Sequence, residues 1–274
     1  MTLPSFGRRC RKALLLGAAA LLASRFAGAA EPAPVQWDIS AGVRQRTLSE
    51  WSDGGARLLT EKGALARVQL DAQLAAPGSP GLALEAAVAD GRLDYEGRTQ
   101  AGAPLATSSR HRENELVLRW RPLPAAAWGE AWLGLGWLHT RRAIASVATA
   151  GGLTETSSLL MPGVRWRSPV LSLPRGGLQW QLEAEWRASA RHRLHVDYLG
   201  VFDDSSLNGG RRSEAALRLS AFAAQDWRWT LEWRHARQSA SESARLYRRS
   251  VPVGSVRQPK LRIDDVTLSL TRRF

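Results

Sequence analysis

The last nine residues of the chain, residues 266–274, alternate between apolar and polar side chains. Val266, Leu268 and Leu270 share one face with Arg272 and the terminal Phe274, whereas the residues between them are threonine, serine and arginine. A period of two residues is the signature of a β-strand, because successive side chains point to opposite faces of a sheet. Similar alternation recurs along the chain, and no segment of useful length has the 3.6-residue period of a helix. The sequence therefore predicts an all-β fold.

Ten segments show this alternation and are predicted to be strands. They cover residues 35–46, 64–74, 82–88, 114–121, 130–137, 160–167, 178–187, 214–221, 227–234 and 266–274. The connections between them are long and short in turn, and the long ones are predicted at residues 48–62, 90–112, 141–156, 188–212 and 236–261. An even number of strands with long loops at one end favours a closed antiparallel up-and-down β-barrel, with eight or twelve strands as the alternatives.

The closing segment, residues 266–274, resembles the last strand of bacterial outer-membrane β-barrel proteins, in which a terminal phenylalanine follows alternating apolar residues. The resemblance implies a porin-like transmembrane barrel in the outer membrane of a Gram-negative bacterium. It also implies a monomer whose C-terminal strand is bound by the barrel-assembly machinery. Alternation alone leaves open a soluble periplasmic sandwich or lipocalin-like barrel, because the strands of such a protein read the same.

Tryptophan is the second feature that favours a membrane. The chain has 12 tryptophans, against 5 phenylalanines and 3 tyrosines, and the indole ring, with its apolar body and polar N–H, suits a membrane interface. Most of the tryptophans fall near the ends of the predicted strands, whereas a soluble core would hold its aromatic residues centrally. The predicted membrane girdle consists of Trp37, Trp120, Trp137, Trp166, Trp180, Trp186, Trp227, Trp229, Trp233 and Phe274.

Residues 1–29 are predicted to be a secretory signal peptide, which leaves residues 30–274 as a single barrel domain. A positively charged start precedes an apolar run of ten residues, and a small-x-small cleavage site follows. Cys10, the only cysteine, lies within this segment, so the predicted mature chain has none. This excludes disulfides, thiol catalysis and cysteine-ligated metals, and no cofactor or metal site is predicted.

The polar face of the predicted strands carries charges of both signs, which are expected to pair across a narrow lumen. The 38 lysines and arginines outnumber the 25 carboxylates, but they interleave with acids and form no basic stripe, so nucleic acid is not an expected partner. A lumen filled by ion pairs favours a structural or surface-interaction role, and a narrow channel for ions or small solutes is the alternative. The predicted lumen charge network consists of Arg44, Arg67, Glu85, Glu115, Arg119, Glu183, Glu185, Arg187, Arg218, Arg228, Glu232 and Arg234.

A third function class, an outer-membrane hydrolase, rests on His195 and Asp197, which are two residues apart and are expected to share a strand face. Ten strands with acids and histidines at the rim resemble the omptin outer-membrane proteases, which use acidic pairs and an Asp-x-His element. This chain has the order His-x-Asp and lacks the tryptophan-rich motifs of that family, so no catalytic residue is assigned. His111 and His139 are expected to be isolated and solvated.

Arginines in the predicted outer loops are candidates for contact with outer-membrane lipid and with the phosphates of lipopolysaccharide. The guanidinium group suits this role because it binds phosphate through a planar fork of donors. The alternative is that these arginines are ordinary solvated loop residues. They are Arg110, Arg112, Arg141, Arg142, Arg211 and Arg212.

Overall fold

The computed structural model describes residues 35–75, 80–98, 102–148, 150–172, 178–224 and 226–274. These residues belong to one compact unit, Val35–Phe274, and the predicted signal peptide lies outside the described residues. Among the described residues, no helix is long and apolar enough to cross a membrane.

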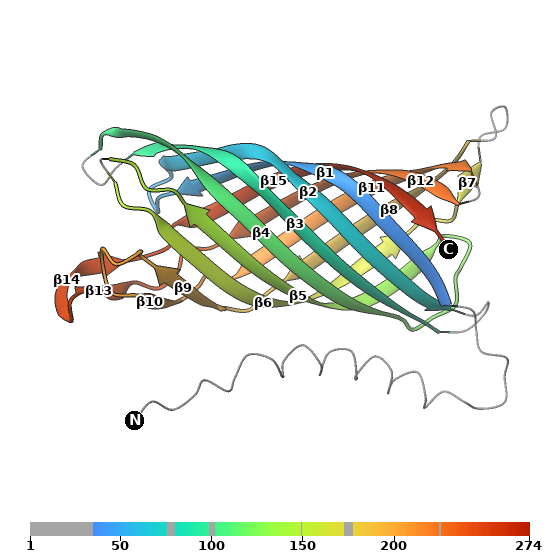
Figure 1. The fold of residues 1–274 in the computed structure, drawn as a ribbon. Helices are drawn as coiled ribbons and strands as arrows, with labels where there is room; N and C mark the ends of the chain where they lie inside the picture. The colour runs from blue at the N-terminus through green and yellow to red at the C-terminus, as the bar shows by residue number, and fades with distance from the viewer. Residues whose placement is uncertain (1–34, 76–79, 99–101, 149, 173–177, 225) are drawn as a thin grey trace, which may run out of the picture. The chain divides into compact units, whose positions relative to one another are not determined.

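Ten long strands form the wall of a closed barrel (Figure 1). They are β1 (Val35–Trp51), β2 (Arg57–Ala75), β3 (Gly81–Arg98), β4 (Pro104–Arg121), β5 (Glu130–Ile144), β6 (Leu153–Arg167), β8 (Gln179–Ala188), β11 (Arg212–Ala224), β12 (Trp227–Gln238) and β15 (Lys260–Arg273). The shorter strands are β7 (Leu171–Ser172), β9 (Arg193–Asp197), β10 (Ser205–Asn208), and the separate hairpin of β13 (Ala244–Arg248) and β14 (Val251–Val256). Successive long strands pair antiparallel, which confirms the predicted all-β, up-and-down barrel of ten strands.

The barrel closes between its first and last strands. β1 pairs antiparallel with β15, with Asp38 opposite Arg273, and the N–H of Phe274 donates to the carbonyl of Trp37 (2.8 Å). β15 pairs on its other side with β12. The backbone N–H and C=O groups of the terminal strands therefore find partners within the wall, as a sheet surrounded by lipid requires.

β6 changes its partner midway along its length. Residues 163–167 pair with β8, whereas residues 154–158 pair with β9. Pro162 lies at this change, opposite Leu135 of β5 on one side and paired with neither β8 nor β9 on the other. Proline has no N–H to give to a ladder, and a break in the pairing is a place where a sheet tolerates it.

The strands extend farther toward one end of the barrel than the predicted segments do. The long connections predicted at residues 48–62 and 90–112 were too long, because β1 to β4 leave only residues 52–56 and 99–103 between them. We call this end the long-loop end, and the opposite end, where Phe274 lies, the short-turn end (Figure 1).

The outer surface of the barrel carries an apolar belt that begins at the short-turn end. In it, exposed aliphatic and aromatic side chains occupy successive outward positions of the long strands. Its members are Val35, Trp37, Ile39, Val43, Val68, Leu70, Leu84, Val88, Leu118, Trp120, Leu133, Leu135, Trp137, Leu160, Val164, Trp186, Leu217, Leu219, Trp227, Trp229, Leu231, Trp233, Val266, Leu268 and Phe274.

Beyond the belt, toward the long-loop end, many outward positions become polar and several inward positions become apolar. On β3 the outward series passes from Val88 to Asp90 and Arg92, while Leu93 and Tyr95 face inward and are buried. The alternation thus continues with the opposite phase. The strands were predicted by following apolar residues on one face, so the predicted strands ended where the apolar residues change face. For this reason the loops predicted at residues 48–62 and 90–112 were too long.

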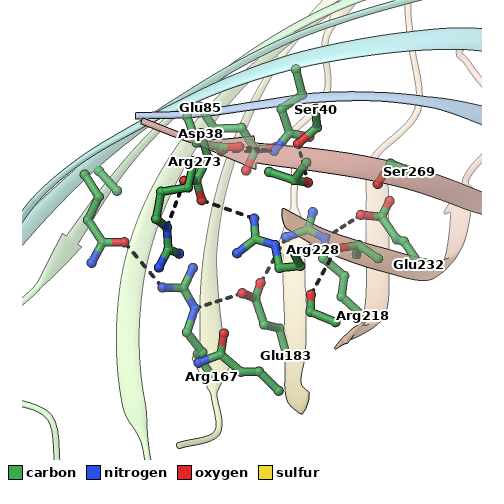
Figure 2. A pocket seen from close by; sticks show the side chains of 18 of the residues that line it. Asp38, Ser40, Glu85, Arg167, Glu183, Arg218, Arg228, Glu232, Ser269 and Arg273 are labelled. Atoms are coloured by element: carbon green, nitrogen blue, oxygen red, sulfur yellow. Dashed lines mark hydrogen bonds and ion pairs between the residues drawn. The ribbon is translucent and has the colours of Figure 1, made fainter. Parts of the chain in front are cut away.

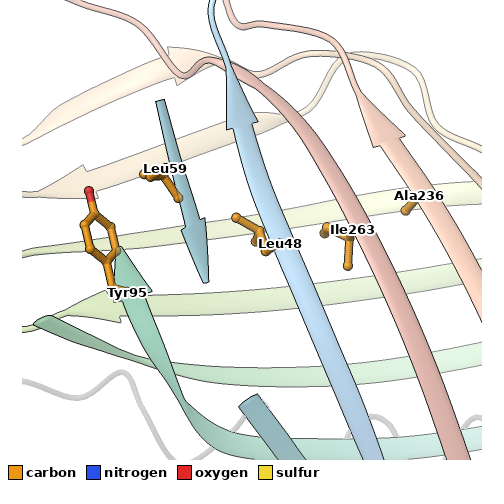
Figure 3. Packing of buried hydrophobic residues seen from close by; sticks show 5 residues of the cluster. All are labelled: Leu48, Leu59, Tyr95, Ala236 and Ile263. Carbon is orange, nitrogen blue, oxygen red and sulfur yellow. The ribbon is translucent and has the colours of Figure 1, made fainter. Parts of the chain in front are cut away.

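Buried apolar side chains occupy part of the interior at the long-loop end. One cluster inside the wall consists of Leu48, Leu59, Tyr95, Ala236 and Ile263 (Figure 3). A second cluster, Leu194, Val196, Tyr198, Leu207 and Leu246, joins β9 and β10 to the hairpin of β13 and β14, which lies at this end (Figure 1). The ends of the molecule therefore differ, and the long-loop end has a core like that of a soluble protein.

Candidate functional site

Inside the apolar belt the inward side chains form a charged lumen. Arginines and carboxylates from all ten long strands face it, and most are buried. Removing a charge from water is costly unless the charge is paired and hydrogen-bonded, so the pairing of these groups determines what the lumen can do.

At the short-turn end the lumen contains a cavity of about 270 Å³, which we call the chamber (Figure 2). Small inward residues on β1, β11, β12 and β15 leave this space: Ser40, Ser220, Thr230, Ser269 and Thr271. The charged residues that line it are Asp38, Arg67, Asp71, Glu85, Arg119, Arg165, Arg167, Glu183, Arg218, Arg228, Glu232 and Arg273.

Several arginines of the chamber are held by more than one carboxylate. Arg119 donates to Glu85 (2.7 Å) and Glu185 (3.0 Å), and Arg165 donates to the same two carboxylates (3.1 and 2.8 Å). These contacts join β3, β4, β6 and β8 across the lumen and fix the side chains on that wall of the chamber.

An ion-pair layer separates the chamber from a smaller cavity of about 50 Å³ at the long-loop end. Arg187 lies 2.5 Å from Glu115 and donates to Glu214 (2.8 Å), while Arg234 lies 3.7 Å from Glu115. The layer consists of Arg44, Glu115, Arg187, Glu214, Arg234 and Asp265, and none of these residues lines either cavity. At the level of this layer, paired charged side chains occupy the lumen between the two cavities.

Glu113 connects this layer to the next level of the lumen. Its carboxylate accepts from Arg44 and from Arg46, each at 2.6 Å, and Arg46 also donates to Asp265 at 2.7 and 2.8 Å. All four side chains are buried. A guanidinium group shared between two carboxylates keeps its donors satisfied without water.

A compact charged cluster lies beyond the belt, at the long-loop end. Arg142 donates to Glu61 (2.5 and 2.9 Å), Glu50 (2.6 Å) and Glu155 (2.9 Å). His111 lies against Glu61, with 2.5 Å between its Nε2 and a carboxylate oxygen. The expectation that His111 is solvated was wrong, because on the extended β4 it occupies an inward position and is only 4% exposed.

Ser109, His111 and Glu61 have the residue types of a hydrolytic triad but not its geometry. The Ser109 hydroxyl lies 3.1 Å from Nε2 of His111 and donates to Glu61 (2.7 Å). In a triad the serine and the acid contact opposite nitrogens of the imidazole, whereas here both contact Nε2. The cluster therefore fits a structural role.

The pKa values in this cluster shift in directions that make it sensitive to acid. Burial opposes ionisation of Glu61, but the charge of Arg142 and the hydrogen bond with His111 outweigh it and lower the pKa of this carboxyl to about 2. Burial, partly offset by Glu61, lowers the pKa of His111 below 6.5. Burial raises the pKa of Glu50. A raised carboxyl pKa changes the pH dependence of stability in the direction opposite to that of Glu61, so a substitution of Glu61 alone is needed to isolate its contribution.

Glu61→Gln is expected to lower the free energy of unfolding at neutral pH by on the order of 3 kcal/mol. Because the folded-state pKa is depressed, the contribution of Glu61 is complete above its unfolded value of 4.5 and is lost as the pH falls toward 2. In urea titrations in detergent micelles, the free energies of unfolding of the wild-type protein and of Glu61→Gln should therefore converge as the pH falls over that range. A difference that stays constant with pH would contradict this assignment. The control is Asp90→Asn, which removes an exposed pair with Arg110.

The structure does not bring His195 and Asp197 together into a catalytic arrangement. Both lie on β9 at exposed or half-buried positions. The Nε2 of His195 is 3.7 Å from Asp204, and Asp197 accepts from the backbone N–H of Leu199 (2.7 Å), as a turn residue does.

The ten residues of the predicted girdle all lie on the outward face of the wall. Eight are exposed, whereas Trp166 and Trp180 are half-buried. Trp132, which was not in the predicted set, faces inward, and the guanidinium carbons of Arg121 and Arg167 lie 5.4 and 5.9 Å from its ring centroid. Strict alternation with Leu133 would have revealed its direction.

The twelve residues of the predicted lumen network all face inward, and each lies within 4.0 Å of at least one oppositely charged side chain. The predicted set left out inward charges within the predicted strands, such as Asp38, Asp71 and Arg165, and others beyond the predicted strand ends. Of the six arginines assigned to outer loops, Arg142 and Arg212 face inward and are buried, and Arg212 donates to Glu214 (2.8 Å). These two continue the inward series of longer strands and cannot meet lipid head groups. Arg110, Arg112 and Arg141 also lie on strands rather than in loops, on β4 and β5, but they face outward and are exposed. Among the described residues, no group of three or more possible ligands is placed to hold a metal.

Comparison with known proteins gives a fold and no sequence family. No family model and no curated protein matches the chain. Among solved structures, the outer membrane protease OmpT from Escherichia coli aligns with 89% of this chain and 98% of its own, at 12% identity and a TM-score of 0.51. The translocator domain of the autotransporter NalP from Neisseria meningitidis aligns with 96% of each chain, at 10% identity and a TM-score of 0.46.

The likeness to OmpT is a likeness of fold, because at 12% identity it carries no activity with it. The closed barrel of ten long strands agrees with that fold. The chain has the fold of a bacterial outer-membrane β-barrel.

Proposed function

We propose that this protein spans the outer membrane as a barrel whose lumen does not conduct, and that it displays the long-loop end outside the cell as an interaction surface. The observation that carries the proposal is the ion-pair layer between the chamber and the small cavity. Its side chains are almost entirely buried and paired across the barrel. A solute passing through would have to break several of these pairs together, and breaking one buried pair costs about 3–5 kcal/mol.

Planar-bilayer recording tests this proposal. The purified, folded barrel is expected to give no conductance steps above the lipid baseline, while a porin inserted into the same bilayer gives steps and serves as the control. Reproducible steps that depend on the barrel would identify the alternative, a narrow channel for ions or small solutes, and would contradict a non-conducting lumen.

We also propose that arginines on the outer face, immediately beyond the belt, bind the phosphates of lipopolysaccharide. These side chains are exposed and lie on two groups of neighbouring strands, β3 to β5 and β12 with β15, where their forks of donors can meet an anionic head group. They are Arg92, Arg110, Arg112, Arg141, Arg237 and Arg262. Arg110 also pairs with Asp90 at 3.0 Å, a contact that is exposed to solvent and therefore weak.

A further inference from the structure

The chamber at the short-turn end is lined by more arginines than carboxylates. Its lining contains seven arginines and five carboxylates among the described residues, and two carboxylates outside the lining, Glu185 and Glu130, pair with four of these arginines. In the proposed orientation its mouth faces the periplasm. The exposed fraction of the arginine side chains falls from 39% at Arg273 to 19% at Arg228 and 7% at Arg67. Solvent therefore reaches the chamber from the short-turn end, and Arg67 lies at its deep side.

Arg67 is buried without a complete set of partners. Its Nε and Nη2 atoms make no hydrogen bond, and its nearest carboxylates, Glu85 and Glu115, are 3.7 and 3.9 Å away. Glu85 is instead engaged by Arg119 and Arg165 at 2.7 and 3.1 Å. A buried guanidinium group with unused donors is costly unless water or another acceptor completes it.

A second arginine of the chamber, Arg228, lies nearer the mouth than Arg67 and also has an unused donor. Arg228 reaches Asp38 at 3.3 Å through Nη2, whereas its Nε is buried and has no hydrogen-bond partner. Small hydroxyl side chains, including Thr230 and Ser269, line the same cavity and offer further donors.

We propose that the chamber is a binding site for a small oxyanion from the periplasm, a solute that carries a phosphate or a carboxylate group. Arg67 binds it at the deep side and Arg228 nearer the mouth, and the hydroxyls that line the chamber complete its hydrogen bonds. Charge-assisted hydrogen bonds from guanidinium groups are strong and suit both kinds of anion. The ion-pair layer ends the chamber, so the oxyanion enters and leaves by the same mouth.

Calorimetric titration of the folded full-length chain in detergent micelles tests the site, with inorganic phosphate and succinate as separate probes. Saturable binding of at least one probe is expected, and Arg67→Gln should weaken it about tenfold or more, since a hydrogen bond to a charged group is lost. Arg110→Gln, on the outer face, is the matched control and should leave the affinity unchanged. The probe that binds more tightly identifies the preferred anionic group. Binding that survives Arg67→Gln would overturn the proposal.

A second measurement does not depend on the probe or on the folding of Arg67→Gln. Ser269→Cys in a Cys10→Ser background places one thiol in the chamber. A negatively charged methanethiosulfonate should modify it about tenfold faster than its positively charged counterpart at low salt, and added salt should reduce this ratio. Equal rates, together with no saturable binding of either probe, would refute the site. Neither measurement depends on whether the barrel conducts in bilayers, so the proposed oxyanion site can fail or succeed independently of the proposed function.

Discussion

Glu113→Gln is expected to lower the free energy of unfolding by about 3–5 kcal/mol, because it removes one partner of a buried pair while leaving the other charges in place. The Glu113 carboxylate accepts from Arg44 and Arg46 at 2.6 Å each. Arg46 keeps its contact with Asp265, but Arg44 is left with Asp265 at 3.7 Å as its nearest carboxylate. The substitution keeps the volume of the side chain, so lost packing does not account for the effect.

Urea-induced unfolding in lipid vesicles measures this change. Asp90→Asn is the control, since it breaks an ion pair with Arg110 whose side chain is 73% exposed, and exposed pairs contribute about 0–1 kcal/mol. Equal effects of the two substitutions would mean that the lumen is wet enough to screen its charges, and the proposal of a non-conducting barrel would then lose its support.

Leu231→Arg is expected to destabilise the barrel in lipid vesicles by about 2–4 kcal/mol, the cost of an arginine on the lipid face near the middle of the bilayer. Leu231 is 48% exposed on β12, between Trp229 and Trp233 on the same face. A soluble barrel would accept this arginine with almost no change, since the position faces solvent in the isolated molecule.

Ser49→Arg provides the comparison for this substitution. Ser49 also faces outward, on β1, but lies beyond Val43, the last member of the belt on that strand. An arginine there should cost about 0–1 kcal/mol. The two variants are compared by urea titration in the same vesicles. If they have the same stability, the apolar belt is not in contact with lipid, and the membrane assignment fails.

The sequence allowed prediction of the fold class because the belt strands obey one simple rule. Apolar residues recur at every second position along these strands, as at Leu268 on β15 and Leu231 on β12. The alternation at residues 266–274 predicted a strand, which the structure shows as β15 paired with β1. Prediction failed where the rule inverts. Leu93 and Tyr95 belong to β3, but their apolar side chains lie on the face that carries charge within the belt.

The partners of the lumen charges were harder to predict than their direction. Alternation places Arg46 and Glu113 on the inward face, but their contact joins residues 67 positions apart in the chain. It depends on the curvature of the barrel and on the register of the strands between them, which no local pattern encodes. The chamber was not predicted for a related reason, since it arises where small residues on four strands meet.

Beyond Val88 the apolar side chains change from the outward to the inward face of the wall, so the two ends of the barrel are stabilised in different ways. Within the belt, apolar side chains face outward, and in the proposed membrane setting the surrounding lipid shields them. At the long-loop end, Leu48, Leu59 and Ile263 are sheltered by the protein itself, so water drives their association even when the lipid is removed. If the long-loop end is displayed outside the cell as proposed, that surface is stabilised by its own packing. It can then keep its shape while the bilayer around the belt thins, changes composition or is replaced by detergent.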